Sequence, residues 1–555
     1  LPNGSTAEPI TVTTAADGSW MAVNLIPGDW QVVEITPQGY LDGLDAAGTA
    51  GGTAQNPGDS ITGIRLESGQ AGENYDFGEI LPSSIAGRVI ADADGDGTFT
   101  AGDFPIEGVT IELRDEQGKR IGTAITDADG RYQFTGLAPG VYAVEEIQPQ
   151  EYFDGVDRVG SAGGTLLAPD AILDIPLVSG TQATGYDFYE ILPSSISGRV
   201  SVDLDGNGLY DAGEPLLGGV AVHLLSASGE RIASTLTDAE GAYQFTGLAP
   251  GVYGVEEIQP QGYFDGPDHV GSAGGTLAGT DKITGITLVN GTHGVRYDFC
   301  EFLPVSLSGH VYEDLNDNGR RDAGEAGIAG VTLTLLDAAG QPTGTTAVTD
   351  SGGFYRFDGL EPNMTYGVGE VQPGGYFDGR DRAGSAGGAA ENPGDRITGA
   401  LLSVGVHGED YDFGELPPAS ISGLVHGELN GDCIPDPGEP LLGGVTIHLL
   451  DASSNRDAST TTDSSGRYVF TDLRPGVYGV HEVQPEGYLQ GKTHAGSAGG
   501  RVEGDRILDV NLMPGIDGVD YNFCEVVPAS ISGYVFQDGP AIEIAQGEEI
   551  GDPHA

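Results

Sequence analysis

A short acidic segment of this sequence has residue types and a spacing that are suited to binding a metal ion. Residues 203–214 read DLDGNGLYDAGE, with side-chain oxygens at positions 1, 3, 5, 9 and 12 and a glycine at position 6. This is the spacing of an EF-hand calcium loop, in which the glycine allows a sharp turn and oxygens surround the ion. The segment therefore predicts a calcium site with the ligands Asp203, Asp205, Asn207, the carbonyl of Leu209, Asp211 and Glu214.

The same pattern occurs twice more. Residues 314–325 read DLNDNGRRDAGE and predict the ligands Asp314, Asn316, Asn318, the carbonyl of Arg320, Asp322 and Glu325. Residues 92–103 read DADGDGTFTAGD and predict the ligands Asp92, Asp94, Asp96, the carbonyl of Thr98, and Asp103. One such match is also typical of an Asx-rich surface turn, but three matches in register favour calcium. No helical pattern flanks the loops, so we expect structural sites rather than EF-hand switches.

The loops belong to a long internal repeat. A phrase such as ILPSSISGRV returns five times, and the repeats begin at Ile85, Ile196, Leu307, Ile421 and Ile531. A spacing of about 111 residues is that of a whole domain, so the pattern indicates separate domains in tandem. We define module 1 as the C-terminal part of a domain (residues 1–84), modules 2 to 5 as residues 85–195, 196–306, 307–420 and 421–530, and residues 531–555 as the N-terminal part of a further domain. Either the sequence is a window of a longer protein, which we favour, or chains join by completing a split module.

Each module reads as an all-β domain. In module 3 the apolar runs SISGRVSV, VAVHLLS, IASTLTD, AYQFTGL, VYGVEEIQ, ITGITLV and VRYDFCE alternate with segments rich in Gly, Asp, Asn and Pro. Alternation along these runs suits sheets with one buried face. Seven short strands predict an immunoglobulin-like β-sandwich in each module.

One phrase gives the modules a family resemblance. Residues 237–266 read TDAEGAYQFTGLAPGVYGVEEIQPQGYFDG, and the phrase recurs from Thr126, Thr349 and Thr462 and more loosely from Thr14. It resembles the signature of the SdrD B-like and Cna-B-like modules of bacterial surface adhesins. The resemblance implies a prealbumin-like seven-stranded sandwich outside the cell, acting as a stalk or an adhesin.

Some Cna-B-like modules carry a Lys–Asn isopeptide bond, which we do not expect here. The lysines, Lys119, Lys282 and Lys492, do not fall in a first strand. The glutamate that assists the bond in such relatives has counterparts at Glu146, Glu257, Glu370 and Glu482, and we interpret these as packing residues.

The predicted topology brings acidic residues to one end of each module. Because antiparallel strands alternate in direction, the acidic loop, the Thr237–Asp238 turn, residues 263–268, Asp298 and Glu301 should meet beside the next module. Calcium there would hold the next module at a fixed angle, and the five-residue linkers with proline are too short for free swinging. The aspartates of the Thr-Asp turns are either secondary ligands or turn formers: Asp127, Asp238, Asp350 and Asp463.

Module 5 departs from the calcium pattern. Its loop, ELNGDCIPDPGE at residues 428–439, begins with Glu428 and has Cys433 in place of the turn glycine, so calcium binding there stays open. The topology places Cys433 near Cys524, and the two could form a disulfide in place of the lost site or remain free thiols. Cys300 has no partner in its own module and is either free or intermolecular.

The composition excludes several functions. The formal charge is -60, which argues against binding nucleic acid or anionic lipid. No apolar run reaches the roughly 20 residues of a membrane span. The GSAGG phrases, at Ser161, Ser272, Ser385 and Ser497, lack the glycine two residues before the serine that a nucleophile elbow requires, and they read as structural turns.

We therefore expect a secreted or cell-surface, calcium-rigidified rod and not an enzyme. Its partners would be the neighbouring modules and copies of itself, end to end or side by side. The alternative is an adhesin whose modules bind an extracellular protein or glycan through exposed aromatic loops: Tyr152–Phe153, Tyr263–Phe264 and Tyr376–Phe377.

Overall fold

The computed structural model describes residues 8–167 and 169–535, in two parts that meet between Phe302 and Leu303. Within these residues the structure consists of strands and loops without a helix, so none of them form a helix that could span a membrane. The all-β fold is confirmed. Of the further domain predicted at residues 531–555, residues 531–535 form no strand and the rest lie outside the described residues.

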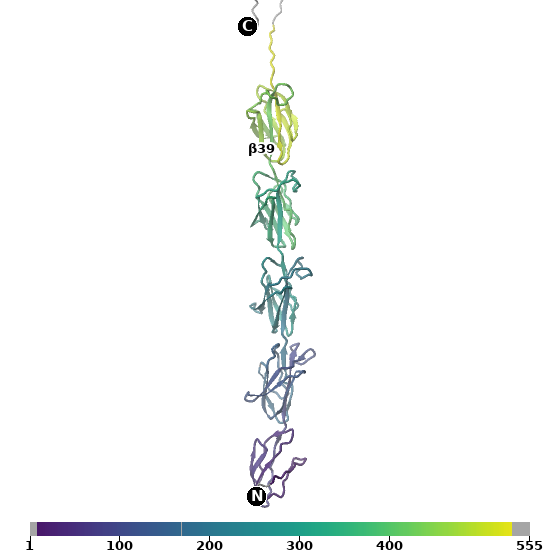
Figure 1. Cartoon of the computed structure of the whole chain (residues 1–555), viewed down its shortest axis with the longest axis vertical. Coiled ribbons are helices and arrows are strands. Elements are labelled where there is room, and N and C mark those ends of the chain that lie inside the picture. The colour runs from purple at the N-terminus through teal and green to yellow at the C-terminus, as the bar shows by residue number, and fades with distance from the viewer. Residues whose placement is uncertain (1–7, 168, 536–555) are drawn as a thin grey trace, which may run out of the picture. The chain divides into compact units, whose positions relative to one another are not determined.

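The first part of the chain contains modules 1 to 3 (purple to blue-green in Figure 1). The strands of module 1 are β1 (Gly28–Val33), β2 (Leu41–Asp42), β3 (Thr53–Gln55), β4 (Ser60–Leu66) and β5 (Glu79–Ile80). Those of module 2 are β6 (Ser83–Asp92), β7 (Phe104–Pro105), β8 (Thr110–Asp115), β9 (Arg120–Ile125), β10 (Arg131–Leu137), β11 (Gly140–Glu146), β12 (Phe153–Asp154), β13 (Thr165–Leu167), β14 (Ala171–Leu177), β15 (Gln182–Ala183) and β16 (Phe188–Ile191). Those of module 3 are β17 (Ser194–Val202), β18 (Ala221–Ser226), β19 (Arg231–Leu236), β20 (Ala242–Leu248), β21 (Gly251–Glu257), β22 (Phe264–Asp265), β23 (Thr276–Leu277), β24 (Lys282–Leu288), β25 (His293–Gly294) and β26 (Phe299–Phe302).

The second part contains modules 4 and 5. The strands of module 4 are β27 (Val305–Glu313), β28 (Thr332–Leu336), β29 (Pro342–Val348), β30 (Phe354–Leu360), β31 (Met364–Glu370), β32 (Phe377–Asp378), β33 (Ala389–Ala390), β34 (Arg396–Leu402) and β35 (Phe413–Leu416). Those of module 5 are β36 (Ala419–Glu428), β37 (Thr446–Leu450), β38 (Arg456–Thr461), β39 (Arg467–Leu473), β40 (Gly476–Glu482), β41 (Leu489–His494), β42 (Arg501–Glu503), β43 (Arg506–Leu512), β44 (Asp517–Gly518) and β45 (Asn522–Val526).

Every complete module is a sandwich of two sheets. In module 3 one sheet has the order β20-β17-β26-β22 and the other has the order β19-β18-β21-β24-β23. The first long strand, β17, pairs in parallel with the last, β26, whereas its other long neighbour, β20, is antiparallel. The seven predicted strands are all present, and the short strands β22, β23 and β25 are added to them. A parallel first and last strand makes the chain leave the module at the end where the acidic loop begins.

The recurring Ser-Gly phrase has a steric reason. A Cβ on Gly198 would lie 1.8 Å from the carbonyl oxygen of Tyr297, and the same clash recurs at Gly87, Gly309 and Gly423. The close approach lets the buried Tyr243 hydroxyl donate to that carbonyl at 2.6 Å. A glycine is therefore required where the first strand passes the chain entering the last strand.

The GSAGG phrases form structural turns, as the sequence predicted. Ser272 Oγ accepts a hydrogen bond from the backbone N–H of Val295 at 3.0 Å. A Cβ on Gly271 would meet the ring of Tyr297 at 2.7 Å, and the Tyr297 hydroxyl in turn donates to the carbonyl of Gly274 at 3.0 Å. The serine thus fastens a turn over a buried tyrosine.

Candidate metal centre

The acidic loop of module 3 folds around the carboxylate of its first residue. Asp203 follows β17 directly and its side chain is buried. Its carboxylate accepts hydrogen bonds from the N–H groups of Gly206 at 2.6 Å and Gly208 at 2.8 Å. Gly208 takes a positive φ of 73°, so the glycine at position 6 provides the expected turn.

The last residue of the loop closes the ring. Glu214 accepts from the N–H of Leu204 at 2.8 Å with one oxygen and from the N–H of Asp211 at 2.8 Å with the other. Carboxylate oxygens of Asp203, Asp205 and Glu214 lie within 4.8 Å of one another. Residues from both ends of the segment therefore converge, and their all-oxygen donor set is the kind that calcium prefers.

The loop of module 4 has the same arrangement. Asp314 is buried and accepts from the N–H of Gly319 at 2.8 Å, and Glu325 accepts from the N–H of Leu315 at 3.0 Å. The side-chain amides of Asn316 and Asn318 donate to Asp322 at 2.9 and 2.8 Å. These hydrogen bonds lower the pKa of Asp322.

The loop of module 2 has the same arrangement, with an aspartate in place of the closing glutamate. Asp92 is buried and accepts from the N–H groups of Gly95 at 2.7 Å and Gly97 at 2.8 Å. Oxygens of Asp92, Asp94 and Asp96 lie within 4.8 Å of one another. Asp103, which replaces the closing glutamate, accepts from the N–H of Ala93 at 2.8 Å and still closes the loop.

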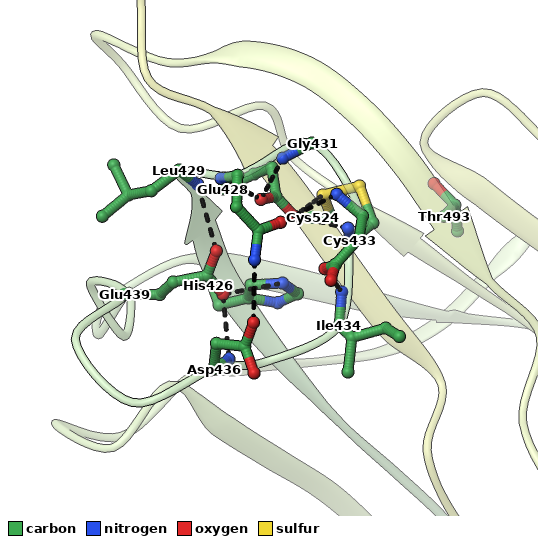
Figure 2. Close-up of a disulfide and its surroundings, with 12 residues drawn as sticks. His426, Glu428, Leu429, Gly431, Cys433, Ile434, Asp436, Glu439, Thr493 and Cys524 are labelled. Atoms are coloured by element: carbon green, nitrogen blue, oxygen red, sulfur yellow. Dashed lines mark hydrogen bonds and ion pairs between the residues drawn. A yellow bond between two sulfur atoms is a disulfide. The ribbon is translucent and has the colours of Figure 1, made fainter.

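The loop of module 5 keeps this fold with different chemistry (Figure 2). Glu428 accepts from the N–H of Gly431 at 2.7 Å, and Glu439 accepts from the N–H of Leu429 at 3.0 Å. Cys433 takes the turn position with a positive φ of 58° and forms a disulfide with Cys524, their Cα atoms 5.6 Å apart. In module 5 the residue at the turn position of the loop is therefore bonded covalently to the last strand, whereas the other modules have a glycine at this position.

A buried histidine in the same place was not foreseen. His426 on β36 is fully buried, and its Nε2 lies 3.8 Å from a carboxylate oxygen of Glu439 (Figure 2). Pairing in register shows that His426 and Cys524 correspond to Ser201 and Cys300 of module 3. Module 3 has Gly208 where module 5 has Cys433, which explains why Cys300 stays a free thiol. Cys300 is fully buried, and burial raises the pKa of its thiol to about 12, so an intermolecular disulfide is not supported.

Other predicted neighbours of the loop have local roles. Asp238 accepts hydrogen bonds from the N–H groups of Glu240 at 3.0 Å and Ala242 at 2.8 Å, which fits a turn former. Asp298 does not lie at the loop, because its carboxylate accepts from the N–H of Arg199 in the middle of β17. The aromatic pairs proposed as ligand platforms are half-buried rather than exposed: Tyr152–Phe153, Tyr263–Phe264 and Tyr376–Phe377.

The glutamates interpreted as packing residues belong to a second acidic group. Glu146 ends β11, and a carboxylate oxygen of it lies within 4.8 Å of oxygens of Asp170 and Glu190. Glu146 lies in the recurring family phrase, whereas Asp170 and Glu190 follow that phrase, so the three residues are spread over more than forty positions of sequence. The signal available in the sequence was the return of Glu, Asp and Glu at the same places in each module.

Comparison with known proteins agrees with this architecture. The family model of the SdrD B-like domain matches residues 83–165, 194–299, 305–414 and 419–506. The chain is 32% identical to serine-aspartate repeat-containing protein D of Staphylococcus aureus (strain Newman) over 498 residues, which are 87% of this chain and 36% of that protein. It is also 32% identical to serine-aspartate repeat-containing protein F of Staphylococcus epidermidis over 451 residues, 79% of this chain and 25% of that protein. The chain thus spans a quarter to about a third of the length of these relatives.

Solved structures give weaker similarities. The major pilin subunit BcpA of Bacillus cereus matches with 11% identity and a TM-score of 0.26, covering 60% of this chain and all of that one. Two B repeat units of the collagen binding protein of Staphylococcus aureus match with 15% identity and a TM-score of 0.14, covering 80% of this chain and all of that one. The family model covers four successive modules and most of the chain. This chain belongs to the SdrD B-like domain family.

Proposed function

We propose that this chain is a stalk segment of a bacterial surface protein, located outside the cell and stiffened by calcium. The similarity to serine-aspartate repeat-containing proteins supports the location, and the tandem modules of one fold support the role of a spacer. Neighbouring modules are its first partners, and association with copies of itself is part of the proposal. The chemistry is that of a structural protein rather than an enzyme.

The observation that carries the calcium proposal is the buried aspartate that opens each complete loop. Asp203 and Asp314 are fully buried and accept N–H groups of their own loops, while the closing glutamate draws the loop back onto its start. Buried carboxylates that face one another repel unless a cation neutralises them. A calcium ion bound by the loop would tie its two ends together and make it rigid.

The position of the loops explains how calcium would act on a stalk. Asp203 N–H donates to the carbonyl of Glu301 at 2.9 Å, so the loop is fastened to the last strand just before the chain leaves the module. Module 5 joins the same two elements by the Cys433–Cys524 disulfide. Under a pulling force, both the calcium-bound loop and the disulfide would hold the last strand of the module in place.

Force spectroscopy on the whole chain tests this function. We expect modules 2, 3 and 4 to unfold at a lower force after calcium is chelated, whereas module 5 keeps its unfolding force until a reductant is added. The contour length released by module 5 should also increase on reduction, because the disulfide closes a loop with a sequence separation of 91. Equal unfolding forces with calcium and with chelator would contradict the proposal.

A further inference from the structure

The two sheets of module 2 enclose five carboxylates, which we call the five-carboxylate cluster. Glu146 ends β11 in one sheet, whereas Asp154 on β12 and Glu190 on β16 stand opposite each other in the other sheet. Oxygens of Glu146, Asp170 and Glu190 lie within 4.8 Å of one another, and so do oxygens of Asp154, Asp157 and Asp170. Asp170 therefore joins two acidic triads into a single group.

The inner part of the cluster is buried and lacks partners. Glu146 is 3% exposed and Glu190 is 0% exposed. Among the described residues, neither carboxylate oxygen of Glu146 has a hydrogen-bond partner, and Oε1 of Glu190 and Oδ1 of Asp170 also lack one. Burial, followed by the negative charges of its cluster neighbours, raises the pKa of Glu146. Because a buried ionised carboxylate without a donor or a counter-charge costs several kcal/mol, either a cation or a bound proton must neutralise this group.

The cluster returns in other modules. Its members are Glu34, Asp42, Asp45, Asp59 and Glu79 in module 1, Glu257, Asp265, Asp268, Asp281 and Glu301 in module 3, and Glu370, Asp378, Asp381, Asp395 and Glu415 in module 4. Both carboxylate oxygens of Glu257 and of Glu370 are again buried and without a partner among the described residues.

Module 5 keeps three carboxylates of the cluster, Glu482, Asp505 and Glu525, and has lost the two at its entrance. Gln490 stands opposite Glu525 in the register in which Asp154 stands opposite Glu190. Thr493, which is labelled in Figure 2, follows on the same strand. Its hydroxyl donates to the carbonyl of Gly504 at 2.7 Å. The module that has replaced its calcium loop with a disulfide has therefore also exchanged carboxylates of the cluster for neutral side chains.

We infer that the five-carboxylate cluster is a second calcium site, separate from the acidic loop, in modules 1 to 4. Two oxygens from each of five carboxylates exceed the six to eight that calcium takes, and such hard, charged donors match that ion. Glu146 and Glu190 would form the inner wall of the site. Asp154 and Asp157, which are half-buried, would form its entrance. The ion would neutralise charges that otherwise repel between the two sheets.

Counting calcium on the whole chain tests the inference. Native mass spectrometry or equilibrium dialysis with calcium alone would compare the parent with Glu146→Gln/Asp157→Asn in the cluster and with Asp92→Asn/Asp94→Asn in the loop of the same module. We expect each double variant to lose at least one ion and the combined variant to lose both sets. Glu145→Gln is the matched control, because Glu145 lies beside Glu146 but pairs outward with Arg114 at 2.5 Å, and it should lose no ion.

The outcomes separate the two sites. If the cluster variant binds as much calcium as the parent at saturation, the inference is overturned, and the buried glutamates share protons instead. If only the loop variant keeps all its ions, the loop proposal fails and the cluster proposal stands. Hydrogen exchange of β8 and β11 reports whether module 2 remains folded. If the cluster double variant unfolds, the single variant Asp154→Asn at the entrance of the cluster is measured in its place. We expect Asp154→Asn to lose at least tenfold in affinity for one calcium ion, and an unchanged affinity would overturn the inference.

Discussion

Removing the carboxylate of Asp203 should reveal how much of the stability of module 3 comes from calcium. This side chain is fully buried and holds the N–H groups of Gly206 and Gly208 at 2.6 and 2.8 Å. In chelator, Asp203→Ala leaves a buried N–H unsatisfied, which costs about 1–3 kcal/mol. A loop with a Kd of about 10 μM, measured in millimolar calcium, should contribute about 2.7 kcal/mol more. The same variant should therefore cost about 4–6 kcal/mol when calcium is present.

Two isosteric variants separate the ion from the loop fold. Asp203→Asn keeps only one of the two oxygens that accept N–H groups, so its cost in chelator should not exceed that of Asp203→Ala, yet it should lose most of the calcium-dependent gain. Asp238→Asn makes the same chemical change in a turn of the same module, where Asp238 accepts from Glu240 and Ala242. The effect of Asp238→Asn should be equal with and without calcium.

Hydrogen exchange measured by mass spectrometry on the whole chain provides the assay. Exchange of peptides from β18 and β21 gives the unfolding free energy of module 3 while the other modules serve as internal references. If Asp203→Ala costs the same in calcium and in chelator, the loop does not bind calcium in the folded module, and the reasoning from the loop geometry is refuted.

Four further predictions concern the native disulfide, an engineered disulfide, the core and pH. Reducing Cys433–Cys524 should cost module 5 about 4–5 kcal/mol, since the closed loop is long, and a denaturant titration of the reduced chain would measure this. Gly208→Cys should form the equivalent disulfide with the buried Cys300, detectable as a loss of thiol titre and as a module 3 that resists chelation. Tyr243→Phe should destabilise module 3 by about 1–3 kcal/mol in both calcium and chelator, because a buried carbonyl loses its donor. Burial keeps the pKa of the cluster carboxylates above their pKa in the unfolded chain. In chelator, the unfolding free energy of modules 2 to 4 should therefore fall as pH rises from about 4 to about 7. A rise of the unfolding free energy across that range would contradict the described burial.

The sequence was sufficient to predict the fold because its local signals agree. Alternating apolar runs, glycine-rich turns and the repeat itself all indicate one sandwich per module. Gly198 shows the limit of such reasoning: the phrase that contains it marked the repeat, but only the structure shows that a side chain there would meet Tyr297. The convergence of the acidic side chains within each loop was also predictable, since these residues are close in sequence and follow a known spacing.

The five-carboxylate cluster could not be predicted in the same way. Its members come from both sheets and meet only when β12 and β16 close over the end of β11. The family resemblance assigns Glu146 only the role of assisting a cross-link, which the absence of a suitable lysine removes, and it says nothing of the other carboxylates. The proposed site is recognised because Glu146 is buried beside Glu190, and this burial depends on the tertiary structure.

Calorimetry of the whole chain, in millimolar calcium and again after chelation, tests the central claim most directly. At about 2.7 kcal/mol per loop, the transitions of modules 2, 3 and 4 should move down by about 10 °C on chelation, whereas the transition of module 5 should move only when its disulfide is reduced. Transitions that all keep their temperatures after chelation would contradict the account, because the acidic loops would then be solvated turns.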